Sequence, residues 1–275
     1  MSIAFLNRDA RTLASTKASF SASLSICWCL VVTPCASLIQ FPRADFLVAA
    51  ALGNRPKFPF LNTNQEYYLP VSILEKARHP PLDGTIRCDD PNEQFQIFVQ
   101  IRQLLLTSQS SRVSLEKMRI LVNIVDDSIL QYLYQDCARE SSSNKQSRAL
   151  VSAAHILMYV VLRQVPPGCP LVRSMCRRLQ NTIGLAASVR AALWKEKKPA
   201  LLWVAFVGML ATRKGVPACV EGQWFLNLFQ STIRDDAQCF DPVTVDNLGR
   251  IMSGFLWDKS YCEPLLADLL ELYSR

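Results

Sequence analysis

The stretch PALLWVAFVGMLATRKG, at residues 199–215, decides the fold because it places eleven consecutive residues of almost purely apolar character at 201–211. A helix needs about 20 apolar residues to cross a bilayer, so this run is too short for a membrane span. A helix that is apolar on every side must be buried on every side. We therefore predict a central core helix, with a buried strand as the alternative. Gly208 inside it predicts a close crossing by another helix.

The composition agrees with a large core and excludes several classes of protein. The chain has 275 residues, of which 50% are hydrophobic and 19% are charged. Its nine glycines form no GxGxxG, GxxxxGK[ST] or GxSxG pattern, so the common phosphate-binding loops and the nucleophile elbow are absent. The net charge is +7, but the cations are scattered rather than gathered on one segment, as a nucleic-acid surface would require.

The ten cysteines form no CxxC pair, and only Cys27 and Cys29 lie close together, as CxC. Four zinc ligands normally come in two closely spaced pairs, so we expect no metal site and no cofactor. Scattered free cysteines behave as small buried hydrophobic residues and are typical of a reducing compartment. The densest basic cluster, RSMCRR at 173–178, is interpreted as a solvated helix face, with an anion contact as the alternative.

The first 44 residues combine cations, many serines and few acids with the apolar segment ICWCLVV at 26–32. This order has features of a secretory signal and of a mitochondrial transit peptide, and it matches neither well. We expect a poorly ordered, atypical leader.

Prolines and polar clusters divide the remaining sequence into helical segments. We predict helices at 44–53, 70–78, 93–108, 114–137 and 148–165, before the apolar run at 201–211. Ser114 is the expected N-cap of the fourth segment, and a serine-rich loop is expected at 139–147. No segment alternates convincingly as a strand does, so we predict an all-α, multi-helix bundle. Its expected organisation is a leader, short helix and proline-rich linker at 1–69, then a helical domain at 70–275.

Four motifs follow one another between residues 162 and 262. They are an LR-x-x-P helix end, an LLW-x-x-x-VG helix, a WF pair and an FLW segment followed by a cysteine. Their residues are Leu162, Arg163 and Pro166; Leu201, Leu202, Trp203, Val207 and Gly208; Trp224 and Phe225; and Phe255, Leu256, Trp257 and Cys262. In this order, they resemble the C-terminal regulatory region of fungal-specific transcription factors over about residues 90–273.

The resemblance implies a helical regulatory domain in the nucleus. Members of this family usually also carry an N-terminal binuclear zinc cluster, in which six cysteines bind two zinc ions and place a helix in the DNA major groove. The chain has no such cluster, since Cys27, Cys29 and Cys35 cannot supply six ligands and the later cysteines are dispersed. The resemblance therefore implies the regulatory half alone, and direct sequence-specific DNA binding is not expected.

Candidate catalytic residues do not assemble into a site, so we predict that the protein is not an enzyme. His79 lies in a proline-bounded loop, and His155 is expected to be a satisfied core histidine. Ser142 and Lys145 form an SxxK match that we place in a polar linker. Asp126 and Asp127 are adjacent and should point to different sides of a helix, whereas Asp235, Asp236 and Asp241 are expected in loops.

Two functional hypotheses remain. The first is a transcription-regulator-like helical module that acts through protein partners of transcription or a small effector. The second is a helical small-molecule-binding protein or enzyme of secondary metabolism with an apolar pocket. Trp203, Phe206, Trp224 and Phe225 are expected to be packing residues, with an interhelical ligand pocket as the alternative. Trp224 and Phe225 are also expected to begin the helix that follows the apolar run and to dock against it. The expected location is the nucleus, with the cytoplasm as the alternative, and the N-terminal segment leaves secretory or mitochondrial targeting open.

Overall fold

The computed structural model describes residues 44–56, 69–78, 93–110, 113–134, 142–184, 186–213 and 219–274. Every regular element within these ranges is a helix, which confirms the predicted all-α fold. The predicted leader lies almost entirely outside the described residues, as do His79, Cys27, Cys29 and Cys35.

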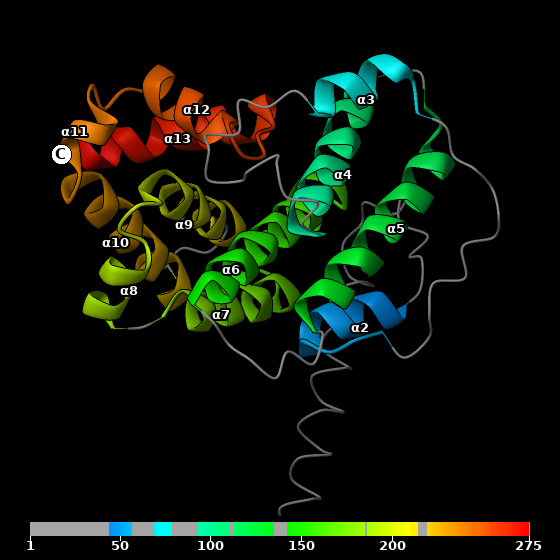
Figure 1. The fold of residues 1–275 in the computed structure, drawn as a ribbon, viewed down its shortest axis with the longest axis horizontal. Helices are drawn as coiled ribbons and strands as arrows, with labels where there is room; N and C mark the ends of the chain where they lie inside the picture. Colours follow the sequence, from blue (N-terminus) through cyan, green and yellow to red (C-terminus); the bar gives the residue numbers. More distant parts are fainter. Residues whose placement is uncertain are drawn as a thin grey trace, which may run out of the picture.

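Figure 1 shows three groups of helices. One end contains α2 (Ala44–Leu52), α3 (Val71–Arg78), α4 (Glu93–Ser108) and α5 (Leu115–Leu133). In the middle lie α6 (Ser142–Leu157), which continues into the π-helical turn η1 (Met158–Leu162), α7 (Pro170–Ile183) and α9 (Lys198–Thr212). At the other end are α8 (Ala187–Leu193), α10 (Val220–Arg234), α11 (Ala237–Phe240), α12 (Val245–Ser253) and α13 (Lys259–Ser274).

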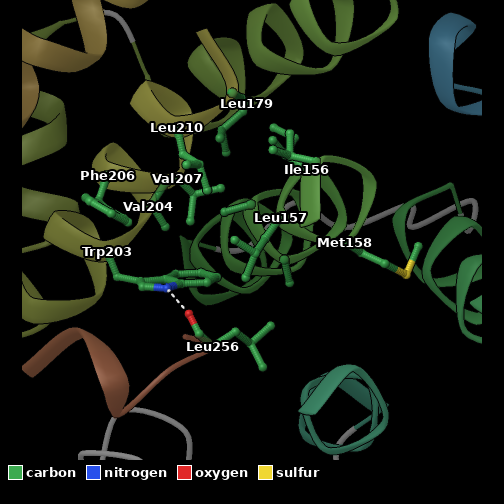
Figure 2. Close-up of a cluster of buried hydrophobic side chains, with 14 of the residues drawn as sticks. Ile156, Leu157, Met158, Leu179, Trp203, Val204, Phe206, Val207, Leu210 and Leu256 are labelled. Atoms are coloured by element: carbon green, nitrogen blue, oxygen red, sulfur yellow. Dashed lines mark hydrogen bonds between the residues drawn. The ribbon is translucent and has the colours of Figure 1, made fainter. Parts of the chain in front are cut away.

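The apolar run forms α9, and this helix is the centre of the core. Its residues from Ala200 to Thr212 are all buried and helical, so the predicted core helix is confirmed and the alternative of a buried strand is wrong. Its most extensive partners are α10 and α6, and it also touches α7, α12 and α13. Figure 2 shows Val204, Val207 and Leu210 of α9 near Leu157 and Leu179, which belong to α6 and α7.

Gly208 permits the close approach of α10 to α9. A Cβ atom at this position would lie 2.3 Å from Cδ1 of Phe225, a distance that no real side chain tolerates. Phe225 is itself fully buried, so its ring has no free space to move into. The predicted close crossing is thus confirmed, and the crossing helix is α10.

Several helix ends follow the local signals in the sequence. Gly53 ends α2 with a φ of 74°, and its N–H donates to the carbonyl of Ala49. Ser114 is the N-cap of α5, because its side chain accepts from the N–H of Lys117. α2 lies before the predicted domain boundary at residue 70 but packs on α5 and α7, and its apolar residues belong to the same core cluster.

Two boundaries differ from the prediction. Ser142 and Lys145 lie in the first turns of α6 rather than in a polar linker, so the serine-rich loop is shorter than expected. The helix expected to begin at the WF pair starts four residues earlier, at Val220, because the sulfur of Cys219 caps it by accepting from the N–H of Gly222.

Candidate functional site

A buried polar cluster centred on Asp126 connects α5 to α6 and η1. Asp126 has no exposed surface, and Nε2 of His155 lies 2.7 Å from its Oδ1. Its Oδ2 accepts hydrogen bonds from the Tyr159 hydroxyl at 3.0 Å and from Nη2 of Arg163 at 2.5 Å. The same nitrogen of Arg163 donates to Oδ1 of Asn123 at 3.0 Å. Burying a carboxylate without partners costs several kcal/mol, and the hydrogen bonds and the Arg163 charge in this cluster offset that cost.

Helical spacing brings these residues together. Asn123 and Asp126 are three residues apart on α5. His155 of α6, Tyr159 of η1 and Arg163, which directly follows η1, come at successive steps of four. Residues at such steps share one face of a helix. The ring of Tyr159 meets that of His155 edge-on at 4.8 Å, and the guanidinium carbon of Arg163 lies 5.2 Å from the Tyr159 ring centre.

The charges of the cluster stabilise one another. Burial by itself raises the pKa of Asp126, but the Arg163 charge and the hydrogen bonds from His155 and Tyr159 outweigh it, so this pKa lies below its usual value. Burial and the neighbouring Asp126 carboxylate raise the pKa of Tyr159 well above the ordinary value. Burial lowers the pKa of Arg163, whereas Asp126 and Tyr159 raise it, and the net shift is upward. Asp126 and Arg163 therefore form a charged pair at neutral pH.

A cavity of about 220 Å³ lies next to this cluster, at the end of α5 and between α6 and α7. His155 belongs to both the cluster and the cavity wall. The other lining residues are Leu133, Tyr134, Arg148, Ser152, Met175, Arg178, Asn181 and Thr182. His155 uses Nε2 for Asp126, which leaves Nδ1 on the other side of the ring.

Both arginines of the cavity bind the carboxyl ends of helices. Nη2 of Arg148 donates to the carbonyl oxygen of Leu133 at 2.7 Å, at the end of α5. Nη1 of Arg178 donates to the carbonyl oxygen of Ala51 at 2.6 Å, and its Nη2 donates to that of Ala50, at the end of α2. Cations are favoured there because the last carbonyls of a helix lack intrahelical partners.

A second cavity, of about 370 Å³, lies between α8, α9 and α10. Trp194, Leu201 and Leu228 give it apolar walls, and Arg190, Lys198 and Asp235 supply charge. Trp203, Phe206, Trp224 and Phe225 line neither this cavity nor the one beside His155.

Three of the four sequence motifs pack together around α9. Trp203 is fully buried and stacks on Phe255, with ring centres 5.4 Å apart. Its indole N–H donates to the carbonyl of Leu256 at 3.0 Å (Figure 2). The ring centres of Phe206 and Trp257 lie 5.3 Å apart.

The WF pair and the LR-x-x-P motif divide between core and periphery. Phe225 is in the core, whereas Trp224 is half-buried and meets the Phe225 ring edge-on. In the LR-x-x-P motif, Arg163 joins the Asp126 cluster, Leu162 is half-buried and Pro166 is exposed. The expected packing role is thus confirmed for Trp203, Phe206 and Phe225.

The remaining candidate residues do not come together. His155 is buried and hydrogen-bonded, as predicted for a satisfied core histidine. Asp235 and Asp236 follow α10, and Asp241 follows α11. Among the described residues, no three His, Cys, Asp or Glu side chains are grouped closely enough to hold a metal ion.

The basic cluster at 173–178 is only in part the solvated face that we expected. Arg173 and Arg177 both pair with Glu221 of α10, whose side chain is buried, while Arg178 binds α2. Burial raises the pKa of Glu221, but the hydrogen bonds to its own backbone and to Arg177, together with the Arg173 charge, lower it overall.

The role of Asp126 was not predicted, although the sequence contains a signal of it. Asp126 lies four residues after Val122 and three before Ile129, both of which are buried, so it occupies the apolar face of α5. An acid at such a position requires buried partners. The identity of those partners depends on the packing of α6 against α5 and is not evident from the sequence.

Comparison with known proteins adds no family or fold relative. No protein-family model, curated protein or solved structure matches the chain. Among the described helices, none combines the length and the hydrophobicity that a membrane crossing requires.

Proposed function

We propose that this protein is a transcription-regulator-like helical module that acts without catalysis, through protein partners or a small effector. It resembles the regulatory region of fungal-specific transcription factors and has no zinc cluster of its own in its sequence. In this proposal, it reaches DNA through its partners and works in the nucleus.

The observation that supports the proposal is the packing of the motif residues. Trp203, Gly208, Phe225, Phe255 and Leu256 come from distant parts of the sequence and contact one another in pairs around α9. The residues that carry the resemblance therefore have one structural role, which is to pack α9 against its neighbours. A recurring structural core is what a resemblance between regulatory domains requires, whereas a recurring catalytic site would place reactive groups around a cavity.

The Asp126 cluster fits a structural role in this proposal. Both oxygens of Asp126 are occupied by His155, Tyr159 and Arg163, and the carboxylate has no exposed surface. Such a carboxylate orients His155 in the wall of the neighbouring cavity, which is where we place the small effector.

A reporter assay tests the proposal. The full chain is fused to a heterologous DNA-binding domain, and transcription from a promoter carrying the matching site is compared with that given by the DNA-binding domain alone. We expect a change in transcription, nuclear localisation of the tagged chain and co-purification of transcription proteins. Unchanged transcription together with exclusion from the nucleus would contradict the proposal.

The second cavity favours the alternative of a small-molecule-binding protein or an enzyme of secondary metabolism. Trp194, Leu201 and Leu228 form an apolar wall between helices, and pockets of this kind bind apolar ligands. Native mass spectrometry of the purified chain separates the two functions. A stoichiometric apolar metabolite that is lost in Leu228→Trp, combined with an inactive reporter fusion, would favour the alternative.

A further inference from the structure

We propose that the cavity beside His155 binds a small organic carboxylate, with Arg148 as its principal contact. That this carboxylate is the small effector rests on the proposed function. That it binds in the cavity rests only on the geometry of α6 and α7.

The cavity lies between polar stripes on two adjacent helices. Arg148, Ser152 and His155 follow one another at steps of four and three along α6, and α6 packs directly on α7. Arg178 and Asn181 lie three residues apart on α7, with Thr182 next to them. Residues at these steps share one face of a helix, so two rows of hydrogen-bonding groups border one space.

The electrostatic character of the wall selects an anion. Two guanidinium groups line the cavity, and no acidic side chain does so among the described lining residues. The partners of Arg148 and Arg178 in the structure are backbone carbonyls and the Ser174 hydroxyl, which carry partial charges only. Asp126 lies behind His155, but its charge is paired with that of Arg163. An anion in the cavity would therefore meet uncompensated positive charge at short range.

Arg148 is better placed than Arg178 to contact the ligand. Its hydrogen bond to Leu133 uses one of the two N–H groups of Nη2, and a guanidinium has five N–H groups in all. Whichever of the two is used, the other still forms a parallel pair with an N–H of Nη1 or with that of Nε. Both terminal nitrogens of Arg178 already bind carbonyl oxygens of α2. Arg178 thus contributes charge, while Arg148 can offer paired N–H groups to the two oxygens of a carboxylate.

The size and the apolar part of the wall indicate an organic anion rather than an inorganic one. A volume of about 220 Å³ equals that of about seven water molecules at liquid density. Leu133 and Met175 provide apolar surface in the wall, which suits a short carbon chain. A dicarboxylate of the size of succinate matches both the volume and the mixed lining.

Isothermal titration of the full chain with succinate, at constant ionic strength, tests the inference. Succinamide serves as the uncharged analogue and orthophosphate as the inorganic anion. We expect saturable binding of succinate, weaker binding of orthophosphate and none of succinamide. Equal binding of orthophosphate and succinate, or no binding of succinate, would overturn the inference.

Variants locate the site. Arg148→Lys keeps the charge but loses the paired N–H groups, and we expect its affinity for succinate to fall by about tenfold or more. Asn181→Ala changes an exposed lining residue and should also weaken binding without affecting the fold. Arg173→Gln is the control, because Arg173 lies on α7, as Asn181 does, but pairs with Glu221 and does not line the cavity. Unchanged affinity in both lining variants, or an equal loss in Arg173→Gln, would refute the assignment.

The reporter fusion separates this inference from the proposed function. Arg148→Lys in that fusion should abolish any response of transcription to added carboxylate. If the titration shows loss of binding and the reporter remains unchanged, the binding site stands and its role as the effector site is refuted.

Discussion

Asp126 is a carboxylate in the core with no exposed surface, and its charge determines how the surrounding residues are arranged. His155, Tyr159 and Arg163 lie 29 to 37 residues later in the chain and all turn toward it. The hydrogen bonds are directional, so they fix the rotation of α6 and η1 relative to α5. An apolar residue of the same size would leave that rotation to packing alone.

Replacing Asp126 should destabilise the protein strongly. Asp126→Asn removes the charge that pairs with Arg163, whose side chain is 9% exposed, and thus leaves a buried cation without a counter-charge. Breaking a buried pair in this way costs about 3–5 kcal/mol. Urea denaturation followed by circular dichroism measures the change. Asp235→Asn, at an exposed position, is the control, and equal stability of the two variants would show that the charge of Asp126 is unimportant.

Trp203 combines packing with a hydrogen bond, and two substitutions separate these contributions. Trp203→Ala removes a fully buried ring and should cost about 3–5 kcal/mol. Trp203→Phe keeps an aromatic ring against Phe255 but leaves the carbonyl of Leu256 without its donor, which should cost about 1–3 kcal/mol.

Lys145→Ala is the control for both Trp203 variants. Lys145 is exposed on α6, so its removal should change the stability by no more than about 0.5 kcal/mol. If Trp203→Ala denatured at the same urea concentration as the parent chain, α9 would not be the centre of the core.

At the scale of single residues, the sequence predicted burial better than it predicted partners. The central position of Trp203 follows from the apolar run around it, since such a run has no face that tolerates water. The contact of Trp203 with Leu256 joins residues 53 positions apart, and local spacing carries no information about it. The two cavity arginines were likewise unpredictable, because each binds the end of another helix, 15 residues away for Arg148 and 127 for Arg178.

Among the helices, α9 and α10 owe their close contact to a single missing side chain. Gly208→Ala would place a methyl group against the buried ring of Phe225, and overpacking of this kind costs about 1–3 kcal/mol. Gly249→Ala is the matched control, because the Cβ atom added there would lie 3.9 Å from the nearest atom outside the helix, a methyl carbon of Leu266.

The two glycine variants should therefore shift the stability in opposite directions. Alanine favours a helix by about 1 kcal/mol over glycine, so Gly249→Ala should raise the melting temperature while Gly208→Ala lowers it. Differential scanning calorimetry of both variants measures the shifts. A shift of the same sign in both would show that helix propensity, rather than contact with α10, decides the effect at Gly208.

The helices themselves were largely predictable, and their boundaries less so. Gly53 and the Ser114 side chain end or begin helices through local backbone interactions, which act within a few residues and are evident in the sequence. The start of α10 depends on a sulfur cap by Cys219, a weak acceptor that sequence rules do not favour. The early start of α6 runs against the expectation from its serines, which prefer loops and caps to helix interiors.

For the whole molecule, the acid side of the stability curve should depend on Asp126. Its pKa is lower in the folded state than in the unfolded chain, so its contribution is fully present above the unfolded pKa of about 4. The contribution is lost as the pH falls through the folded pKa. Glu221, whose pKa is also lowered, adds to the same dependence.

The free energy of unfolding should thus decrease below about pH 4. Urea titrations at a series of pH values measure this decrease, and Asp126→Asn should make the curve flatter in the same range. A curve of identical shape in the variant would show that other carboxylates govern acid unfolding.

The stacking of Trp203 on Phe255 also affects how the chain is made. At about 5–20 residues per second, a ribosome needs about 3–10 s to advance from Trp203 to Leu256. During that interval, α9 has been synthesised while the segment that closes over its indole ring has not. The nascent chain therefore leaves the Trp203 face of α9 uncovered for seconds, and transiently exposed apolar surface of this kind promotes aggregation until the covering segment arrives.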